Sequence, residues 1–178
     1  MTTTKRNNLK AEKIHDFSAF YHSYERLIRS TLFHLVGRND LDDLVQQTFI
    51  RCWQSYDQFD GRSKASTWIT RIAINLSRDH WRKMKGDLKA LDAEAEADVV
   101  DERTISLSER REDRQAIETA LKSLSFEHRS VVALLYFQEM SLEEISEVTG
   151  DPVGTVKSRL HYARVELRRL LKKMGVEA

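Results

Sequence analysis

Residues 141–160 read SLEEISEVTGDPVGTVKSRL, and this segment contains the start and end signals of one short helix and the start signal of a second helix. Ser141 and Glu144 have the spacing of a capping box, in which each side chain bonds the backbone N–H of the other residue. Gly150 suits the left-handed residue that ends a helix, and Pro152 suits the first turn of the next helix. The segment therefore predicts a helix-turn-helix.

The second helix of this segment is predicted to have one apolar face and one polar, cationic face. The apolar face contains Val153, Val156, Leu160, Ala163, Leu167 and Leu170. From residue 151 to residue 178, seven basic residues stand against three acidic ones. Such a helix suits the DNA major groove, although helix-turn-helix geometry also occurs in proteins that bind no DNA. The residues that point outward or flank the apolar face, and are predicted to contact DNA, are Lys157, Ser158, Arg159, His161, Tyr162 and Arg164.

A second basic surface is predicted on a helix over residues 67–85. One face contains Ile69, Ile72, Ala73, Leu76 and His80, and the opposite face contains Arg71, Asn75, Arg78, Arg82 and Lys85. Residues 62–85 contain seven basic residues and one acidic residue. A charged run is usually a solvated face, but Asn75 can pair with a base edge and aromatic rings hold unstacked bases. Both interpretations stay open at this point.

Three neighbouring features bear on that choice. Trp68 lies next to the apolar face and is predicted to be core, whereas Trp81 lies to one side and its role stays open. The loop Gly61–Ser66 is small and polar enough to form a pocket for a base rotated out of the duplex.

Two more amphipathic helices are predicted before this surface. Apolar residues recur every three or four positions from Ile14 to Leu35, which indicates the first helix. A turn at residues 37–39 follows, Asp40 is a candidate N-cap, and a second apolar stripe runs from Leu41 to Tyr56. The two stripes are expected to pack on each other.

The chain changes character after residue 86. Residues 87–113 contain ten acidic residues against four basic ones, and residues 87–104 contain no aromatic residue. This part has too little apolar surface to order itself and is predicted to be a linker. It is either a solvated tether or an acidic segment that transiently covers a basic surface. Further helices are predicted at residues 107–124 and 127–138.

Composition limits the remaining possibilities. The 178 residues include only six Gly and one Pro, so an all-α protein is expected. The net charge is +1, so attraction to nucleic acid must come from local patches. The lone Cys52 cannot form an internal disulfide and is predicted to be a small buried hydrophobe.

Several classes of function find no support in the sequence. No stretch approaches the roughly 18 apolar residues of a membrane span, so a cytoplasmic protein without stable membrane insertion is expected. The six His residues lack metal-ligand spacing, and no glycine-rich phosphate loop is present. We therefore expect no enzymatic activity, no metal and no cofactor.

Three stretches together resemble the extracytoplasmic-function (ECF) sigma factors of the sigma-70 family. They are DLVQQTF at residues 43–49, TWITRIAIN at residues 67–75 and PVGTVKSRL at residues 152–160, and they occur in the family's order and separations. The resemblance implies two small helical domains. Residues 1–86 would form a region 2 domain that binds RNA polymerase and melts the promoter, residues 87–106 the acidic linker, and residues 107–178 a region 4 helix-turn-helix domain.

The same resemblance implies roles for particular residues. The helix of residues 41–53 would dock on the clamp helices of the largest polymerase subunit, with the flap region as a further polymerase contact. The residues implied in polymerase binding are Asp43, Gln46, Gln47, Ile50 and Arg51. Those implied in binding the downstream promoter element are Arg62, Ser63, Lys64, Arg71, Asn75, Arg78 and Arg82. The helix of residues 153–170 would read the upstream element.

The sequence departs from the family pattern at a few of these surfaces. Gln47 stands where the family commonly has Glu, and Leu135 and Tyr162 stand where some members have Arg. These departures affect which individual residues are expected to contact DNA or polymerase. The assignment of the surfaces does not depend on them.

The expected function is that of a sigma factor in transcription initiation, which recognises promoter DNA and opens the strands. The resemblance further implies a stress or envelope response and control by an anti-sigma factor, and the acidic segment could then occupy the nucleic-acid channel of the polymerase. The rival interpretation is a regulator that binds duplex DNA as a dimer, with half-sites about one helical turn apart.

Overall fold

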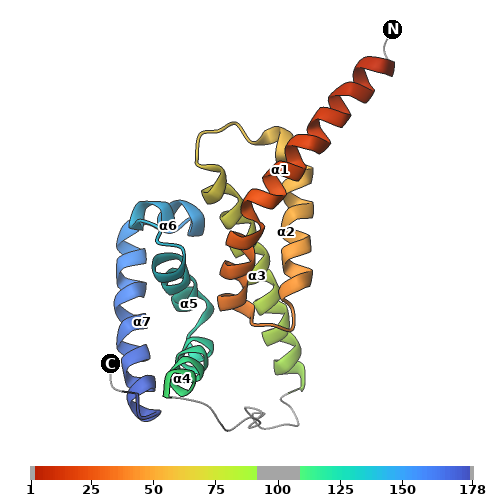
Figure 1. Cartoon of the computed structure of the whole chain (residues 1–178). Helices are drawn as coiled ribbons and strands as arrows, with labels where there is room; N and C mark the ends of the chain where they lie inside the picture. Colours follow the sequence, from red (N-terminus) through yellow and green to blue (C-terminus); the bar gives the residue numbers. More distant parts are fainter. Residues whose placement is uncertain (1–2, 92–108, 177–178) are drawn as a thin grey trace.

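The structure, a computed structural model, describes the backbone of residues 3–91 and 109–176 and the side chains of residues 17–86 and 115–176. All regular elements in these ranges are helical, which confirms the predicted fold class. The helices form two groups that lie side by side (Figure 1), an N-terminal half and a C-terminal half. The segment predicted to be an acidic linker falls largely on residues 92–108, which lie outside the described residues.

The N-terminal half consists of α1 (Thr3–Val36), α2 (Leu41–Ser55), the short 3₁₀ turn η1 (Tyr56–Gln58) and α3 (Ala65–Leu91). The predicted apolar stripes meet between them, and each of the three α-helices contacts the other two. Their common core contains Ile28, Leu32, Leu44, Val45, Phe49, Cys52, Ile69 and Ala73. Trp68 packs against this core, as predicted.

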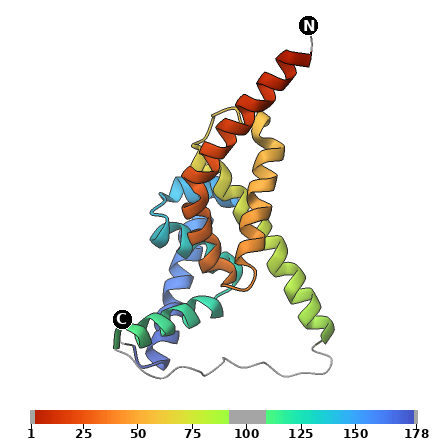
Figure 2. The same ribbon diagram turned by 45° about the vertical axis from the view of Figure 1, so that its right-hand side comes forward.

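Two helices of this half are longer than the apolar pattern predicted. Helix α1 begins at Thr3 instead of Ile14, and its first turns project beyond α2 and α3 (Figure 2). Helix α3 continues to Leu91 instead of ending near Lys85. Residues rich in Lys, Ala, Glu and Leu favour a helix even where no apolar face has to be buried, so periodicity alone underestimates helix length.

The C-terminal half consists of α4 (Glu109–Ser123), α5 (Phe126–Val132), the π-helix η2 (Ala133–Phe137), α6 (Leu142–Thr149) and α7 (Val153–Lys173). Both hydrogen bonds of the predicted capping box start α6, and Gly150 ends it with φ at +76°. Pro152 precedes the first turn of α7 as its N-cap residue. The predicted helix-turn-helix is therefore present.

The helix predicted over residues 127–138 is divided in the structure. Helix α5 ends at Val132 and the chain continues as the wider π-helix η2. Glu139 follows with φ at +53°, a left-handed conformation that is uncommon outside glycine. Sequence periodicity does not distinguish a π-helical turn from an α-helical one, because a π-helical turn contains only one residue more and shifts the following side chains by that single position.

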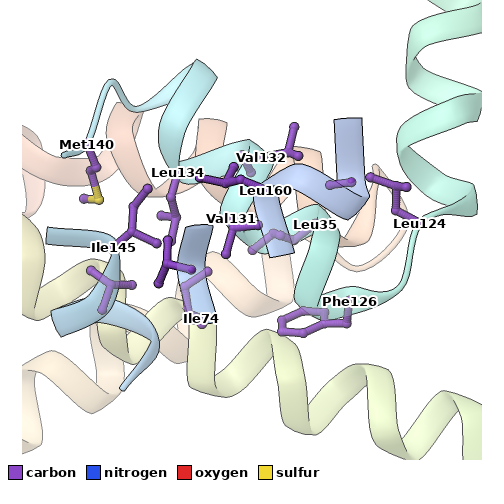
Figure 3. Close-up of a cluster of buried hydrophobic side chains, with 14 of the residues drawn as sticks. Leu35, Ile74, Leu124, Phe126, Val131, Val132, Leu134, Met140, Ile145 and Leu160 are labelled. Atoms are coloured by element: carbon purple, nitrogen blue, oxygen red, sulfur yellow. The ribbon is translucent and has the colours of Figure 1, made fainter. Parts of the chain in front are cut away.

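The two halves share part of their apolar core. Leu35 of α1 and Ile74 of α3, 1% and 0% exposed, belong to a cluster whose other members are C-terminal. Figure 3 shows both residues beside Phe126 and Val131 of α5 and Ile145 of α6. Burying a Leu or Ile side chain stabilises a fold by about 1.5–3 kcal/mol, so the contact between the halves has a substantial apolar component.

Candidate nucleic-acid and polymerase interfaces

Helix α7 presents the face that was predicted to read DNA. Val156, Leu160 and Ala163 are buried against α5 and α6, which fixes the rotation of the helix. The opposite face is exposed at Lys157, Ser158, His161, Tyr162 and Arg164. Tyr162 is 62% exposed, an unusual position for a large ring that suits contact with a partner.

Two of the arginines predicted to contact DNA already have partners in the protein. Arg159 binds both carboxylate oxygens of Asp151, with Nη2 to Oδ1 at 3.1 Å, and so ties α7 to the turn that precedes it. Arg164 donates from Nε to the hydroxyl of Tyr136 at 2.9 Å and lies over its ring. Both contacts fix the orientation of the guanidinium groups.

The basic face of α3 is exposed along most of its length. Arg71, Asn75 and Arg82 are exposed, whereas Arg78 is half-buried over the ring of Phe126. In the loop before α3, Arg62 forms an ion pair with Asp60 at 2.6 Å. Ser63 in this loop is half-buried. The basic surface therefore begins in the loop and continues along the helix.

Lys64, in the same loop, contacts the C-terminal half. Its Nζ lies 2.7 Å from Oε1 of Glu144 at the start of α6. The interaction raises the pKa of Lys64, and it also lowers the pKa of Glu144 together with the Ser141 backbone N–H. A side chain predicted to hold promoter DNA is thus bound to the other half of the protein.

Asn75 lines a polar groove of about 400 Å³ between α2, η1 and α3. Its other lining residues are Arg51, Gln54, Ser55, Gln58, Ile72, Leu76 and Asp79. The loop Gly61–Ser66, expected to build a base pocket with Asn75, supplies none of these residues. Arg51, which the resemblance implied in polymerase binding, lies in this groove. Gln54 of α2 and Gln58 of η1 were not predicted as site residues, although Arg51, Gln54 and Gln58 recur at helical spacing opposite the apolar stripe.

A second groove lies between α1 and α2. It has a volume of about 390 Å³ and is lined mainly by Phe17, Tyr21, Val45, Phe49 and Trp53. At its edge are two of the residues implied in polymerase binding, Gln46 and the 48% exposed Ile50. Asp43 and Gln47 are exposed on the same helix. The exposed residues at the edge of this groove were predicted as contact residues from the sequence, whereas the aromatic residues that line it were expected to be core.

Several other predictions concern single side chains. Cys52 is fully buried, as predicted. Trp81, whose role was open, packs against Phe126 of the C-terminal half, with ring centroids 6.1 Å apart. Asp40 occupies the N-cap position of α2, but its side chain makes no capping bond and lies instead 3.2 Å from Nε2 of His80.

Two general features of the described ranges bear on function. Among the described side chains of residues 17–86 and 115–176, no group of three or more His, Cys, Asp or Glu is arranged to hold a metal. In the same ranges, no helix combines the length and apolar character needed to cross a bilayer.

Both halves match known protein families. Residues 20–86 match Sigma-70 region 2, and residues 120–169 match Sigma-70, region 4. The chain is 35% identical over 164 residues to the ECF RNA polymerase sigma factor SigW of Bacillus subtilis (strain 168), covering 84% of this chain and 85% of that protein. It is 32% identical over 152 residues to the ECF RNA polymerase sigma-E factor of Escherichia coli (strain K12), covering 79% and 78%.

Two solved structures share the fold. One is the sigma factor RpoE in complex with the anti-sigma factor NepR from Bartonella quintana, with a TM-score of 0.72, 27% identity and coverage of 88% of this chain and 97% of that one. The other is CnrH in complex with the cytosolic domain of CnrY, with a TM-score of 0.63, 25% identity and 88% coverage of both chains.

The region 2 match distinguishes between the two interpretations left open by the sequence. A dimeric helix-turn-helix regulator would account for the C-terminal half but not for the N-terminal match. The chain belongs to the ECF group of the sigma-70 family, and it is a non-enzymatic RNA polymerase sigma factor that acts in transcription initiation.

Proposed function

We propose that this sigma factor contacts its promoter through two separate surfaces and core polymerase through a third. The basic face of α3 and the Asn75 groove bind the unwound downstream element. The exposed face of α7 reads the upstream element in the major groove. The aromatic groove between α1 and α2 receives the clamp helices of the largest polymerase subunit, and the flap region contacts the C-terminal half. In this assignment residues 1–86 and 107–178 act as two domains joined by a linker.

The observation that supports the downstream assignment most directly is the position of Asn75. Its amide lies exposed in a polar groove that also contains the exposed Arg51 and Asp79. Arg71 and Arg82 are exposed on the same helix, about one turn before and two turns after Asn75. An amide presents a donor and an acceptor together, which matches a base edge, while guanidinium groups hold the adjacent phosphates. A groove of about 400 Å³ is large enough to admit part of a nucleotide, and its mainly polar lining suits a polar ligand.

The polymerase assignment is supported by the shape and composition of the aromatic groove. Interfaces are enriched in aromatic anchors at their centre, with polar residues at the rim. Phe17, Tyr21 and Trp53 supply the aromatic wall, and Gln46 and Ile50 supply the rim. A helix of the partner can insert an apolar side chain there.

The solved relatives support the proposal of an anti-sigma partner and a cytoplasmic location. Both solved neighbours were determined with a second protein, described for RpoE as the anti-sigma factor NepR and for CnrH as the cytosolic domain of CnrY. We propose that this chain is likewise controlled by an anti-sigma factor, acts in the cytoplasm and serves a stress or envelope response.

The Asn75 assignment can be tested by separating strand opening from duplex binding. Asn75→Ala is expected to slow open-complex formation about tenfold, since a paired base contact contributes about 1–3 kcal/mol of discrimination. Closed-complex affinity should change less than about twofold, because phosphate contacts dominate duplex binding. Opening is followed by permanganate reactivity of unpaired thymines, and Asn39→Ala, an exposed amide outside the groove, is the matched control. If the variant weakens duplex binding and leaves opening unchanged, the assignment is wrong.

A further inference from the structure

Tyr136 of η2 and Arg164 of α7 form a contact at the edge of the exposed face of α7. Nε of Arg164 donates to the Tyr136 hydroxyl at 2.9 Å, and Cζ of Arg164 lies 5.8 Å from the centroid of the Tyr136 ring. We propose that this pair is a clamp for one backbone phosphate of duplex DNA. In the clamp, Tyr136 orients Arg164 and donates its own hydroxyl proton to the phosphate. The inference rests on the proposed function of α7 as the helix that reads the upstream element.

Both members of the clamp keep hydrogen-bonding capacity for a phosphate. A guanidinium group has N–H donors on its two Nη atoms besides the one on Nε, which Arg164 uses for the tyrosine. A phenol oxygen that accepts a hydrogen bond can still donate its own proton. Tyr136 is 54% exposed and Arg164 is exposed, so a DNA backbone can reach both groups. Hydrogen bonds from these donors to an anionic oxygen are charge-assisted and therefore strong.

The partner of Arg164 differs from the partners of two other arginines of α7. Arg159 binds the carboxylate of Asp151. Arg169 donates from Nε to the carboxylate of Glu166 at 2.9 Å. A carboxylate neutralises the guanidinium group that it holds, and it repels a phosphate. A phenol hydroxyl is uncharged at neutral pH, so it restricts the motion of the Arg164 side chain while the positive charge stays available to DNA.

The π-helix η2 presents the tyrosine on the surface. Ala133 and Leu134 at the start of η2 are buried, whereas Tyr136 is largely exposed. A large exposed ring that contributes little to the core suits contact with a partner. Turns of π-helix are rare and occur frequently at functional sites. The clamp gives this turn a role, because η2 supplies a hydroxyl donor beside α7.

The position of the clamp along α7 suits the DNA backbone. Lys157, which is predicted to contact DNA, lies seven residues before Arg164, so the two exposed cations project from the same side of the helix. Side chains that flank the reading face of a recognition helix contact the phosphates along the groove. The clamp therefore continues the cationic edge of α7 and extends it onto a second element.

The clamp is tested by binding of the full chain to a fluorescently labelled duplex of mixed sequence, because phosphate contacts do not depend on the bases. Affinity is measured by anisotropy over a series of salt concentrations. Tyr136→Phe keeps the ring and removes the hydroxyl, and we expect affinity to fall roughly 3- to 10-fold, the factor that corresponds to one hydrogen bond. The salt dependence should stay the same, because no charge is lost. Tyr24→Phe, at a half-buried position of α1, is the matched control and should bind as the unaltered protein does.

Arg164→Ala removes the charged member of the clamp. We expect weaker binding and a slope of log affinity against log salt that is smaller by about one, since one phosphate contact is lost. Arg26→Ala, at an exposed position of α1, is the control for the lost charge. In the Arg164→Ala background, Tyr136→Phe should weaken binding by less than about twofold, because the two groups act together on one phosphate. Thermal melts confirm that the variants fold.

The outcomes separate the clamp from the proposed function of α7. If Tyr136→Phe binds the duplex normally while Arg164→Ala loses affinity, the clamp is wrong and the DNA contact of α7 stands. If Arg164→Ala also binds normally, the proposed DNA contact of Arg164 is wrong as well. Weaker association of Tyr136→Phe with core polymerase, at unchanged duplex affinity, would assign Tyr136 to a protein interface and overturn the clamp. A full loss from Tyr136→Phe in the Arg164→Ala background would show that the two groups act independently, which contradicts the clamp.

Discussion

The guanidinium group of Arg129 in α5 donates hydrogen bonds to the carbonyl oxygens of Leu35, Lys122 and Leu124. Replacing Arg129 with Met leaves three carbonyl groups without donors, and we expect the free energy of unfolding to fall by about 3 kcal/mol. Arg129→Lys should recover less than half, because an ammonium group cannot span the separated carbonyl groups as a planar guanidinium does. Urea denaturation measures both. Arg26→Met, an exposed control, should change stability by less than about 0.5 kcal/mol, and an equal loss in the control would contradict the assignment.

Cys52 provides a test of burial at one position. Burial raises the pKa of its thiol from 9.0 to about 12, so at pH 8 the folded protein contains roughly a thousandfold less thiolate than the unfolded chain. We therefore expect Ellman's reagent to react very slowly with the native protein and rapidly in concentrated urea. Comparable rates in the two conditions would show that the core of the N-terminal half opens frequently.

The capping box at the start of α6 is the element with the clearest energetic prediction. Ser141→Ala removes the bond to the Glu144 backbone N–H and should lower the free energy of unfolding by about 1 kcal/mol. Glu144→Gln is the matched variant, because Gln can still accept from the Ser141 backbone N–H. Urea denaturation near neutral pH should therefore show a larger loss for Ser141→Ala than for Glu144→Gln. The reverse order would contradict the role of the box.

The same element has a pH dependence. Lys64 lowers the pKa of Glu144 below its ordinary value of 4.5, and the Ser141 backbone N–H contributes in the same direction. A carboxylate with a lowered folded pKa stabilises the fold fully above its unfolded pKa, and this contribution is lost as the pH falls through the folded value. Stability should therefore decline below pH 4.5, and Glu144→Gln should make that decline shallower. Identical acid profiles for the two proteins would rule out the contribution.

Elements with strong local signals were predicted well from the sequence. The helix-turn-helix was predicted from the capping box, Gly150 and the apolar stripe of α7. These signals can be read from the sequence because helix capping and periodicity depend on residues only a few positions apart. The early start of α1 and the π-helix η2 were missed for the complementary reason. The residues before Ile14 have no apolar stripe in the sequence. A π-helical turn changes the periodicity over too few residues to be detected in the sequence.

The arrangement of the whole molecule was the least predictable feature. Leu35 and Ile74 continue the apolar stripes of their helices, and nothing in the spacing shows that they are buried by the other half. Likewise Asn75 was predicted from its cationic surroundings, whereas Gln54 of α2 and Gln58 of η1 enter its groove only because these elements lie beside α3. Local patterns identify which face is buried or charged, but they do not identify the partner of that face.

Because the two halves share buried residues, we expect them to unfold together. All three Trp residues, at positions 53, 68 and 81, lie in the N-terminal half, so their fluorescence follows that half while circular dichroism follows all helices. The two urea transitions should coincide in the unaltered protein.

Leu35→Ala should lower the free energy of unfolding by about 3 kcal/mol and separate the two transitions, because it weakens the shared cluster. Ile28→Ala, in the separate N-terminal core, should destabilise that half by a similar amount without weakening the contact between the halves. Transitions that are already separate in the unaltered protein would show that the halves unfold independently and that the shared cluster does not couple them.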